Sequence, residues 1–373
     1  MNIIFACGGT GGHINPAIAI ANMWKERHPD SNILFIGATG HMEEKLVPAA
    51  GYRLKTFSAS GMSRKLNWKG IKNNVKAVAD LVGAVNGCKK LIREFKPDVI
   101  VGTGGYASFP ALMAGHQLKI PTCIHEANAM PGLANRMAAA WAAKILICFP
   151  ESAQHYKHPE KAQVVGMPVR ADFVDADREK ARRELGLDSR PLIVSAFGSQ
   201  GARAMNFAMA DMMKLEQEEG FPYQHIHAVG SFGWGWMPEH VKSLGVDVAA
   251  SGAIDMREYI YDMPRVMAAA DVIISRAGSS TCNEIAACGT PCVLIPSPNV
   301  TDNHQEKNAR AIENKGGAVV VLEKDCTAQA LYDAVKSIVH DSSRQSAMRK
   351  ALKSCSIPDS AQRICDAMES LIG

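Results

Sequence analysis

The sequence predicts an α/β protein of two doubly wound domains, each a parallel sheet covered by helices on both faces. The chain has 373 residues, which is the length of two ordinary domains. Short runs rich in Ile and Val alternate with longer helical patterns. These runs are continuously apolar, as in strands buried on both faces. The same order of strand, glycine-rich loop and helix opens each half, near residues 2 and 192.

Eight apolar runs have the length and composition of parallel strands. In order, they are Asn2–Cys7, Ile33–Ile36, Asp98–Thr103, Lys144–Cys148, Leu192–Phe197, Asp271–Ser275, Cys292–Ile295 and Ala318–Leu322. A break near Met167–Arg170 is followed by the polar stretch Asp172–Arg190. We interpret this region as the connection between the two domains.

The composition is globular and excludes several classes of protein. Hydrophobic residues make up 47% and charged residues 21%, which excludes a disordered or collagenous chain. No apolar run reaches the roughly 18 residues of a membrane span, and the first residues lack the basic start of a secretory signal. None of the ten cysteines forms a C-x-x-C pair, so neither structural zinc nor a disulfide framework is expected. We expect a cytoplasmic protein.

Positive charge is concentrated in one segment. The net charge is +4, yet residues 53–96 alone hold 11 basic and 2 acidic residues. The helical stripe in this segment is Trp68, Ile71, Val75, Val78, Val82 and Val85. One interpretation is that the stripe packs on the sheet. The other is that the surface Gly61–Lys76 binds anionic lipid, where each basic residue can contribute about 1 kcal/mol. The segment lacks the aromatic and basic pattern of a nucleic-acid site, so we expect no nucleic-acid partner.

Small-residue loops follow the predicted strands in both halves. Gly8–Gly12 lacks the lysine of a P-loop and the G-x-G-x-x-G spacing, and no acidic residue ends the second strand. A nucleotide-dependent oxidoreductase therefore stays only as an alternative. Because the carboxyl ends of parallel strands share one edge, the loops predict a cleft for a phosphorylated substrate, bound by helix N-termini.

Three positions each have two interpretations. His13 is either a general base toward a substrate hydroxyl or a helix-entry histidine that contacts only backbone or phosphate. Glu284 either binds a ribose diol or forms a capping box with Thr281. Asp175 and Asp177 have the spacing of a metal-binding pair, but acids at a helix start are the favoured explanation. No carboxylate cluster predicts a dedicated metal site.

Seven motifs, in order over essentially the whole chain, resemble the MurG family. These bacterial transferases add N-acetylglucosamine to undecaprenyl-pyrophosphoryl-N-acetylmuramoyl-pentapeptide. The motifs are Gly8–His13 with Pro16, Gly104–Pro110, His125–Asn128, Gly166–Arg170, Gly198–Arg203, Ser279–Glu284 and Asp302–Gln305. The sequence departs from the family pattern at Phe197, Met167 and Ala127, where glycine, asparagine and glutamine are usual. Phe197 stands beside a phosphate-binding turn, so we expect it to alter loop shape or donor affinity without removing Ser199.

The resemblance implies a glycosyltransferase B fold, in which two Rossmann-like domains face a central cleft. The acceptor and membrane domain would cover residues 1–168 and include a C-terminal helix at 357–373. The donor domain would cover residues 169–356 and bind UDP-N-acetylglucosamine. The second substrate would be the undecaprenyl-linked acceptor lipid, which lies in the inner leaflet of the membrane.

Matching positions imply the site residues. On the donor side, the Ile260 backbone and Arg170 would hold the uracil, and Glu284 would hold the ribose. The diphosphate would be bound by Ser199, Ser279, Ser280 and Thr281. Gln305, with His304, would bind the sugar. On the acceptor side, the lining would be Thr10, Gly11, Gly12 and Asn128. His13 and Asn128 are the candidate catalytic residues.

The expected reaction is a single inverting displacement in which the acceptor 4-hydroxyl attacks the anomeric carbon and UDP leaves. Its product serves peptidoglycan synthesis, and so cell shape and division. No cofactor is required in this scheme, and Mg²⁺ acts at most as a stimulant. The protein would work as a peripheral protein on the cytoplasmic face of the plasma membrane. The alternatives are another UDP-sugar enzyme of the same fold, such as a natural-product glycosyltransferase or a UDP-N-acetylglucosamine epimerase, and a non-catalytic membrane scaffold.

Overall fold

The chain divides into two compact units in a computed structural model. The structure describes residues 1–58 and 68–372, without the side chains of 68–76 and of Ala250. Unit 1 comprises Met1–Pro168 and Asp359–Gly373, and unit 2 comprises Val169–Pro358. Each unit has its own parallel sheet and its own core.

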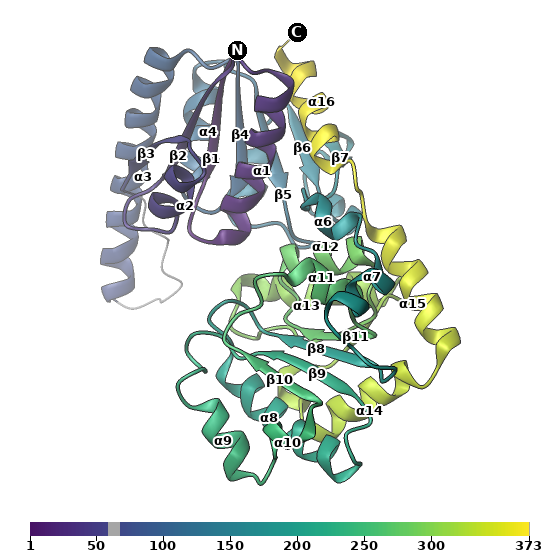
Figure 1. Ribbon diagram of the computed structural model, residues 1–373. Helices are drawn as coiled ribbons and strands as arrows, with labels where there is room; N and C mark the ends of the chain where they lie inside the picture. Colours follow the sequence, from purple (N-terminus) through teal and green to yellow (C-terminus); the bar gives the residue numbers. More distant parts are fainter. Residues whose placement is uncertain (59–67, 373) are drawn as a thin grey trace. The chain divides into compact units, whose positions relative to one another are not determined.

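The sheet of unit 1 has seven parallel strands in the order β3-β2-β1-β4-β5-β6-β7 (Figure 1). The strands are β1 (Asn2–Cys7), β2 (Asn32–Ala38), β3 (Arg53–Phe57), β4 (Val99–Gly104), β5 (Thr122–Glu126), β6 (Lys144–Ile147) and β7 (Ala162–Val164). The strand order reverses between β1 and β4, which pair directly. Loops after these two strands therefore lie where ligands bind in open α/β sheets.

Helices cover both faces of this sheet. They are α1 (Gly11–Arg27), α2 (Glu43–Ala49), α3 (Trp68–Phe95), α4 (Ser108–Gln117), α5 (Leu133–Ala139) and α16 (Ser360–Ile372), with 3-10 turns η1 (Pro150–His155) and η2 (Pro159–Lys161). Along β1, Ile3 and Phe5 face the core under α1 and α16, whereas Ile4 and Ala6 face the core under α3, α4 and α5. This alternation explains why the strand has no polar face.

Helix α16 packs beside α1, as Figure 1 shows in yellow and purple. Its apolar side reaches the core that contains Trp24. At the rim, Arg27 pairs with Asp366 at 2.6 Å, and Nε2 of His28 lies 2.8 Å from a carboxylate oxygen of Glu369. The last element of the chain is thus a structural part of unit 1.

The predicted packing of the apolar stripe on α3 is wrong at two positions. Val78 and Val82 are 51% and 56% exposed, whereas Val85 is buried. Smaller side chains such as Ala77 and Cys88 are buried instead, and α3 packs closely against α4. The expected lipid-binding surface Gly61–Lys76 lies outside the residues whose side chains the structure describes.

Unit 2 repeats the topology with six parallel strands in the order β10-β9-β8-β11-β12-β13 (Figure 1). The strands are β8 (Leu192–Ala196), β9 (Gln224–Ala228), β10 (Ile254–Arg257), β11 (Val272–Ser275), β12 (Cys292–Leu294) and β13 (Ala318–Val320). The main helices are α8 (Arg203–Glu218), α9 (Met237–Ser243), α11 (Met263–Ala269), α12 (Ser279–Cys288), α13 (His304–Glu313), α14 (Ala328–Val339) and α15 (Ser342–Cys355), with shorter turns α10 (Val248–Ser251), η3 (Thr301–Asn303) and η4 (Glu323–Asp325). The two doubly wound parallel sheets predicted from the sequence are confirmed.

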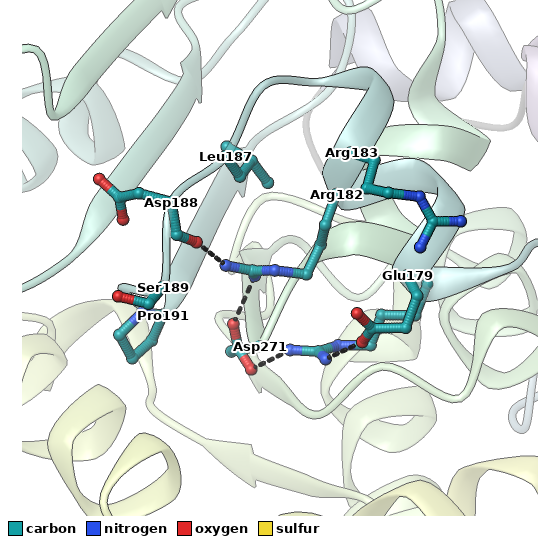
Figure 2. A pocket seen from close by; sticks show the side chains of 9 residues that line it. Glu179, Arg182, Arg183, Leu187, Asp188, Ser189, Pro191 and Asp271 are labelled. Atoms are coloured by element: carbon teal, nitrogen blue, oxygen red, sulfur yellow. Dashed lines mark hydrogen bonds and ion pairs between the residues drawn. The ribbon is translucent and has the colours of Figure 1, made fainter.

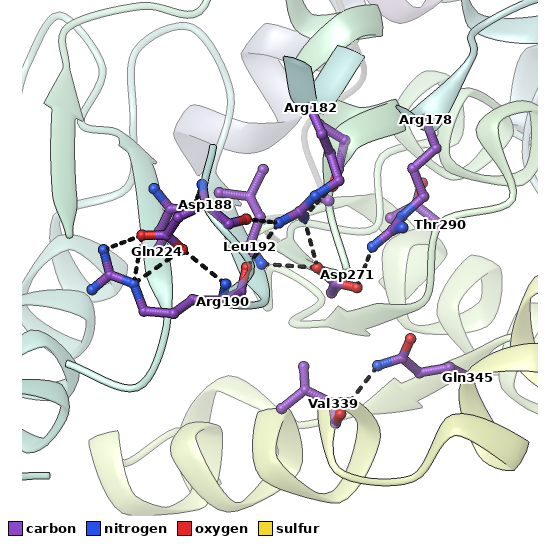
Figure 3. A network of polar contacts seen from close by, with 12 residues as sticks. Arg178, Arg182, Asp188, Arg190, Leu192, Gln224, Asp271, Thr290, Val339 and Gln345 are labelled. Atoms are coloured by element: carbon purple, nitrogen blue, oxygen red, sulfur yellow. Dashed lines mark hydrogen bonds and ion pairs between the residues drawn. The ribbon is translucent and has the colours of Figure 1, made fainter. Parts of the chain in front are cut away.

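The polar stretch Asp172–Arg190 is an integral part of unit 2, which corrects its interpretation as an interdomain connection. Its helices α6 (Ala171–Val174) and α7 (Arg178–Glu184) pack on α12 and α11. Arg178 and Arg182 pair with the buried Asp271 at 2.6 and 3.1 Å (Figure 3). Asp177 accepts a hydrogen bond from the Lys180 amide at 2.8 Å and so caps α7. Asp177 is thus an acid at a helix start, as favoured above.

Candidate functional site

His13 stands at the carboxyl edge of unit 1, in the first turn of α1. Its Nδ1 lies 3.1 Å from the carbonyl oxygen of Gly8 and, at a longer 3.4 Å, from Oγ1 of Thr10, a hydroxyl that can accept as well as donate. Because a carbonyl can only accept, Nδ1 carries the proton in the neutral ring, and Nε2 keeps its lone pair. The side chain is half-buried, and Nε2 forms no hydrogen bond to the described part of the chain. Nε2 is therefore available to accept a proton from a ligand.

Gly104, the last residue of β4, and Gly105 after it hold a second loop against this histidine. A Cβ on Gly104 would lie 2.8 Å from Cδ2 of His13, and one on Gly105 would lie 2.2 Å from the carbonyl oxygen of Gly8. Both glycines have positive φ, 109° and 79°, so the loop tolerates no side chain for reasons of space and backbone conformation. Thr103 also donates to the His13 carbonyl at 2.7 Å. The glycines thus permit the close approach that fixes the ring.

Asn128 belongs to the loop that follows β5. Glu126, only 2% exposed, accepts from the Asn128 amide at 2.9 Å and from its side-chain Nδ2 at 3.2 Å. The other carboxylate oxygen accepts from the Gly132 amide and from Asn135, so one buried carboxylate organises the whole loop. Glu126 lies in the His125–Asn128 motif, but the sequence predicted no role for it.

The start of α1 suits an anion. Thr10 is the N-cap residue, but no side chain caps the helix, and no acidic residue lies in the first turn. The amides of Gly11 and Gly12 begin a 17-residue helix, whose N-terminus carries a partial positive charge. Thr10 and Gly12 are exposed. The structure therefore brings Thr10, Gly11, Gly12 and His13 together, with Asn128 two strands along the same edge.

The predicted donor residues of unit 2 follow four different strands at one edge of the sheet. Ser199 follows β8, Ile260 follows β10, Ser279 follows β11 and Gln305 follows β12. All these strands are parallel, so their carboxyl ends lie together. Ser199 is exposed, whereas the Ile260 side chain is only 2% exposed. Only the backbone of Ile260 can therefore meet a ligand.

The start of helix α12 in unit 2 also suits an anion. Its N-cap is Gly278, no side chain caps it, and its first turn holds Ser279, Ser280 and Thr281 but no acid. A capping box requires Thr281 at the N-cap and Glu284 as the third residue of the helix. Thr281 is instead the third residue and Glu284 the sixth, so the capping-box interpretation is wrong. Ser280, Thr281 and Glu284 share one side of the helix by their spacing.

Glu284 is half-buried beside Arg170. Burial raises the pKa of the Glu284 carboxyl, and the positive charge of Arg170 opposes that rise. Arg170 also pairs with Asp172 through two hydrogen bonds of 3.1 and 2.9 Å. A carboxylate that lacks full hydration is a good acceptor for paired hydroxyl groups.

The loop before α13 positions the last two predicted residues. Gln305 accepts from the Ser297 amide at 2.9 Å, which ties it to the loop that follows β12. Nδ1 of His304 donates to the Thr301 carbonyl at 3.1 Å. Asp302 and Asn303 both have φ of 53°, so the chain turns sharply into α13 through two left-handed residues.

Phe197, the main departure from the family pattern, points into the core of unit 2. It is 4% exposed, and its ring centroid lies 6.2 Å from that of His227. The following residues, Gly198–Gln200, are exposed. The bulky side chain is accommodated in the core, and Ser199 keeps its exposed place; an effect on donor affinity stays a prediction.

A pocket of about 400 Å³ in unit 2 lies elsewhere, at the amino ends of β8 and β11 (Figure 2). Its wall is an internally paired network. Arg182 donates to Asp271 and to the carbonyls of Asp188 and Arg190, at 2.7 and 2.8 Å for the two carbonyls. This pocket is structural and is not part of the candidate site.

The comparisons with known proteins agree with this arrangement. Residues 3–147 match the glycosyltransferase family 28 N-terminal domain, and residues 192–364 match the glycosyltransferase family 28 C-terminal domain. The fold and the two edges thus define a two-domain glycosyltransferase of the B fold.

Relatives along the full length specify the family. A protein of Acetivibrio thermocellus is 37% identical over 373 residues, which cover 100% of this chain and 98% of that protein. It is named UDP-N-acetylglucosamine–N-acetylmuramyl-(pentapeptide) pyrophosphoryl-undecaprenol N-acetylglucosamine transferase. A protein of the same name from a Thermoanaerobacter species is 40% identical over 372 residues and is covered completely. The crystal structure of Acinetobacter baumannii MurG has a TM-score of 0.80 at 24% identity, with 99% of each chain covered. The chain belongs to the MurG family.

Proposed function

We propose that this protein transfers N-acetylglucosamine from UDP-N-acetylglucosamine to the 4-hydroxyl of the N-acetylmuramoyl unit of undecaprenyl-pyrophosphoryl-N-acetylmuramoyl-pentapeptide. This step converts lipid I to lipid II in peptidoglycan synthesis. The names of the full-length relatives support the substrates. The observation that carries the chemistry is the Gly8 carbonyl on Nδ1 of His13, which leaves Nε2 as a base.

The reaction is an inverting displacement with balanced proton and electron movement. Nε2 of His13 takes the proton of the acceptor 4-hydroxyl as its oxygen bonds to the anomeric carbon. The bond from that carbon to the donor phosphate oxygen breaks, and its electron pair leaves with UDP. A correctly placed general base contributes about 10²–10⁴-fold to the rate.

The donor edge stabilises the charge that develops on UDP. The uncapped start of α12 and the hydroxyls of Ser279, Ser280 and Thr281 suit the diphosphate. Glu284 accepts from the ribose diol, and the Ile260 backbone with Arg170 frames the uracil. Ser199 contacts the diphosphate from the loop after β8, and Gln305 with His304 reads the sugar hydroxyls.

The proposed reaction needs no metal ion. In the described residues, no three His, Cys, Asp or Glu side chains are grouped as metal ligands. Helix N-termini and backbone amides take the role that a divalent cation plays in other nucleotide-sugar enzymes. Titration with Mg²⁺ and EDTA tests this point, and loss of activity in EDTA would contradict it.

We also propose that unit 1 docks peripherally on the cytoplasmic leaflet that holds the acceptor. Helix α3 exposes Val78 and Val82 within the chain's most basic segment. None of the helices in the residues described has the length and apolarity needed to cross a membrane. The expected surface Gly61–Lys76 adjoins these valines in sequence.

Product analysis tests the proposed function. The protein is incubated with UDP-N-acetylglucosamine and a short-chain analogue of the acceptor lipid, and the products are identified by mass spectrometry. We expect a disaccharide lipid and one UDP for each transfer. Consumption of donor without acceptor would indicate an epimerase. Binding of lipid without any donor turnover would indicate a scaffold.

A further inference from the structure

Glu43 is a fully buried carboxylate that no sequence motif indicated. It is the first residue of α2, is 0% exposed, and forms no ion pair among the described residues. Oε1 accepts from the Ala38 amide at 2.8 Å, and Oε2 accepts from the Gly9 amide at 3.2 Å. The carboxylate thus joins the loop that follows β1 to the last residue of β2. Burying a carboxylate without a cation is costly, so a carboxylate at this place suggests a role beyond packing.

Two glycines make room for this carboxylate. A Cβ on Gly8 would lie 2.5 Å from Oε1 of Glu43, and one on Gly37 would lie 2.6 Å from its Cγ. Real Cβ contacts are never this short. The Gly8–Gly9 loop is therefore shaped around the carboxylate as well as around the ring of His13.

The decisive observation is that Glu43 and His13 contact opposite ends of one peptide group. The Gly9 N–H that donates to Glu43 and the Gly8 carbonyl that faces Nδ1 of His13 belong to the same planar amide. The described chain has no cis peptide, so these two groups point in opposite directions. Hydrogen bonds in such a chain polarise one another, so a negative charge on the N–H side makes the carbonyl a stronger acceptor.

We infer that Glu43 is a positioning residue for His13 and acts through the Gly8–Gly9 peptide. The Glu43 carboxylate polarises this peptide, the Gly8 carbonyl holds the Nδ1 proton, and Nε2 is kept as the lone-pair nitrogen. In many enzymes a carboxylate bonded directly to a catalytic histidine fixes the tautomer and orientation of its ring. Here Glu43 has the same effect on His13, with one amide inserted between the two side chains. The inference rests on the proposed function only for its kinetic consequence.

The test compares Glu43→Gln with Glu44→Gln in the whole chain. Glu44 is the next residue on α2 and is exposed, so its variant controls for loss of one negative charge. Two-bond ¹H–¹⁵N spectra report the histidine tautomers, and the His13 signals are identified by their loss in His13→Gln. We expect the Nδ1–H tautomer in the wild type and in Glu44→Gln, and a mixture of tautomers in Glu43→Gln.

The kinetic arm measures transfer from UDP-N-acetylglucosamine to the lipid acceptor. We expect Glu43→Gln to lower kcat at least tenfold and to leave the KM for the donor within twofold, because unit 2 holds the donor residues. Glu44→Gln should match the wild type. A parallel fall in kcat and in donor binding would reveal a merely structural role and overturn the inference.

Two further results would also overturn it. One is an unchanged tautomer together with unchanged kcat in Glu43→Gln. The other is an Nε2–H tautomer of His13 in the wild type, whatever the variants at Glu43 and Glu44 show. If the wild type transfers no sugar, the proposed function fails, and the spectra alone still decide whether Glu43 controls His13.

Discussion

The carboxylate of Glu216 lies 3.0 Å from Nδ1 of His225, and both side chains are shielded from solvent within unit 2. Nε2 of His225 lies 2.7 Å from Oγ of Ser195, and the same hydroxyl lies 2.7 Å from Nδ1 of His227. Four polar side chains from α8, β8 and β9 thus form one hydrogen-bonded chain inside an apolar core. This network ends at His227, whose Nε2 is buried without a partner in the described part of the chain. Removing one member of such a network leaves the others without partners.

We therefore predict that Glu216→Ala destabilises the protein by about 3–5 kcal/mol, the cost of breaking a buried pair. Denaturant unfolding of the full chain, followed by tryptophan fluorescence and circular dichroism, measures the loss. Glu218→Ala, an exposed change two residues away, should alter the free energy of unfolding by under about 0.5 kcal/mol. Equal effects of the two variants would contradict the network's importance.

Stability should fall as the pH is lowered from 6.5 toward 4. Burial lowers the pKa of His125 to about 4, and burial together with the neighbouring His225 lowers the pKa of His227 to about 3. Both values lie below the ordinary 6.5, so in this window the unfolded chain binds protons that the folded chain excludes. Each histidine contributes a slope of at most about 1.4 kcal/mol per pH unit.

Urea unfolding at pH 7, 6 and 5 measures this dependence. The slope should be smaller in His227→Gln, because that variant lacks one of the two buried imidazoles. His116→Gln, which changes an exposed ring, should keep the wild-type slope. A pH-independent midpoint in the wild type would show that these histidines are solvated in solution.

Changes at the carboxyl edge of the unit 1 sheet should affect kcat without affecting UDP affinity. His13→Ala should lower kcat about 10²–10⁴-fold while UDP still binds with wild-type affinity, because His13 belongs to unit 1. Isothermal titration with UDP and steady-state transfer rates provide the two measurements. A variant that keeps near wild-type turnover at saturating substrates would remove His13 from the reaction.

Glu284→Ala should act on the donor instead. Loss of hydrogen bonds to a charged acceptor costs about 1.5–3 kcal/mol, which is a weakening of UDP affinity of about 10–100-fold. Glu179→Ala, an exposed change on α7, is the matched control. Unchanged binding of UDP to Glu284→Ala would show that another group holds the ribose.

Membrane binding should depend on α3. We expect the double change Val78→Glu and Val82→Glu to weaken binding to phosphatidylglycerol vesicles about tenfold, since it removes apolar surface and adds negative charge. Vesicle co-sedimentation measures this. Tyr261→Glu changes an 87% exposed side chain of unit 2 and should bind as the wild type does. A similar loss in both variants would argue against a specific surface on α3.

Strands such as β1 and β11 were predictable from the sequence because they are buried on both faces and consist almost entirely of apolar residues. Strand β9 escaped prediction because His225 and His227 interrupt its apolar run. Their hydrogen bonds go to Glu216 and Ser195, which come from elsewhere in the chain. Hydrogen bonds between residues so far apart in the sequence leave no local sequence pattern from which the strand could be predicted.

The site shows the same division. The glycines around His13 were visible because close backbone approach demands glycine at fixed places in the chain. Glu43 was not, because Met42-Glu43-Glu44 reads as an ordinary acidic helix start. Its importance depends on the Gly8–Gly9 peptide, which lies between the Glu43 carboxylate and the His13 ring. That placement exists only in the folded backbone.

The placement of α16 bears on how the protein is made. Ile364 and Met368 complete the core around Trp24, yet they leave the ribosome after every residue of unit 2. Residues 1–168 therefore stay incompletely packed until α16 has been synthesised, whereas unit 2 can fold as it emerges. A nascent chain that stalls before α16 is made would expose the apolar surface beside α1 that α16 covers. Chaperones bind apolar surfaces of this kind.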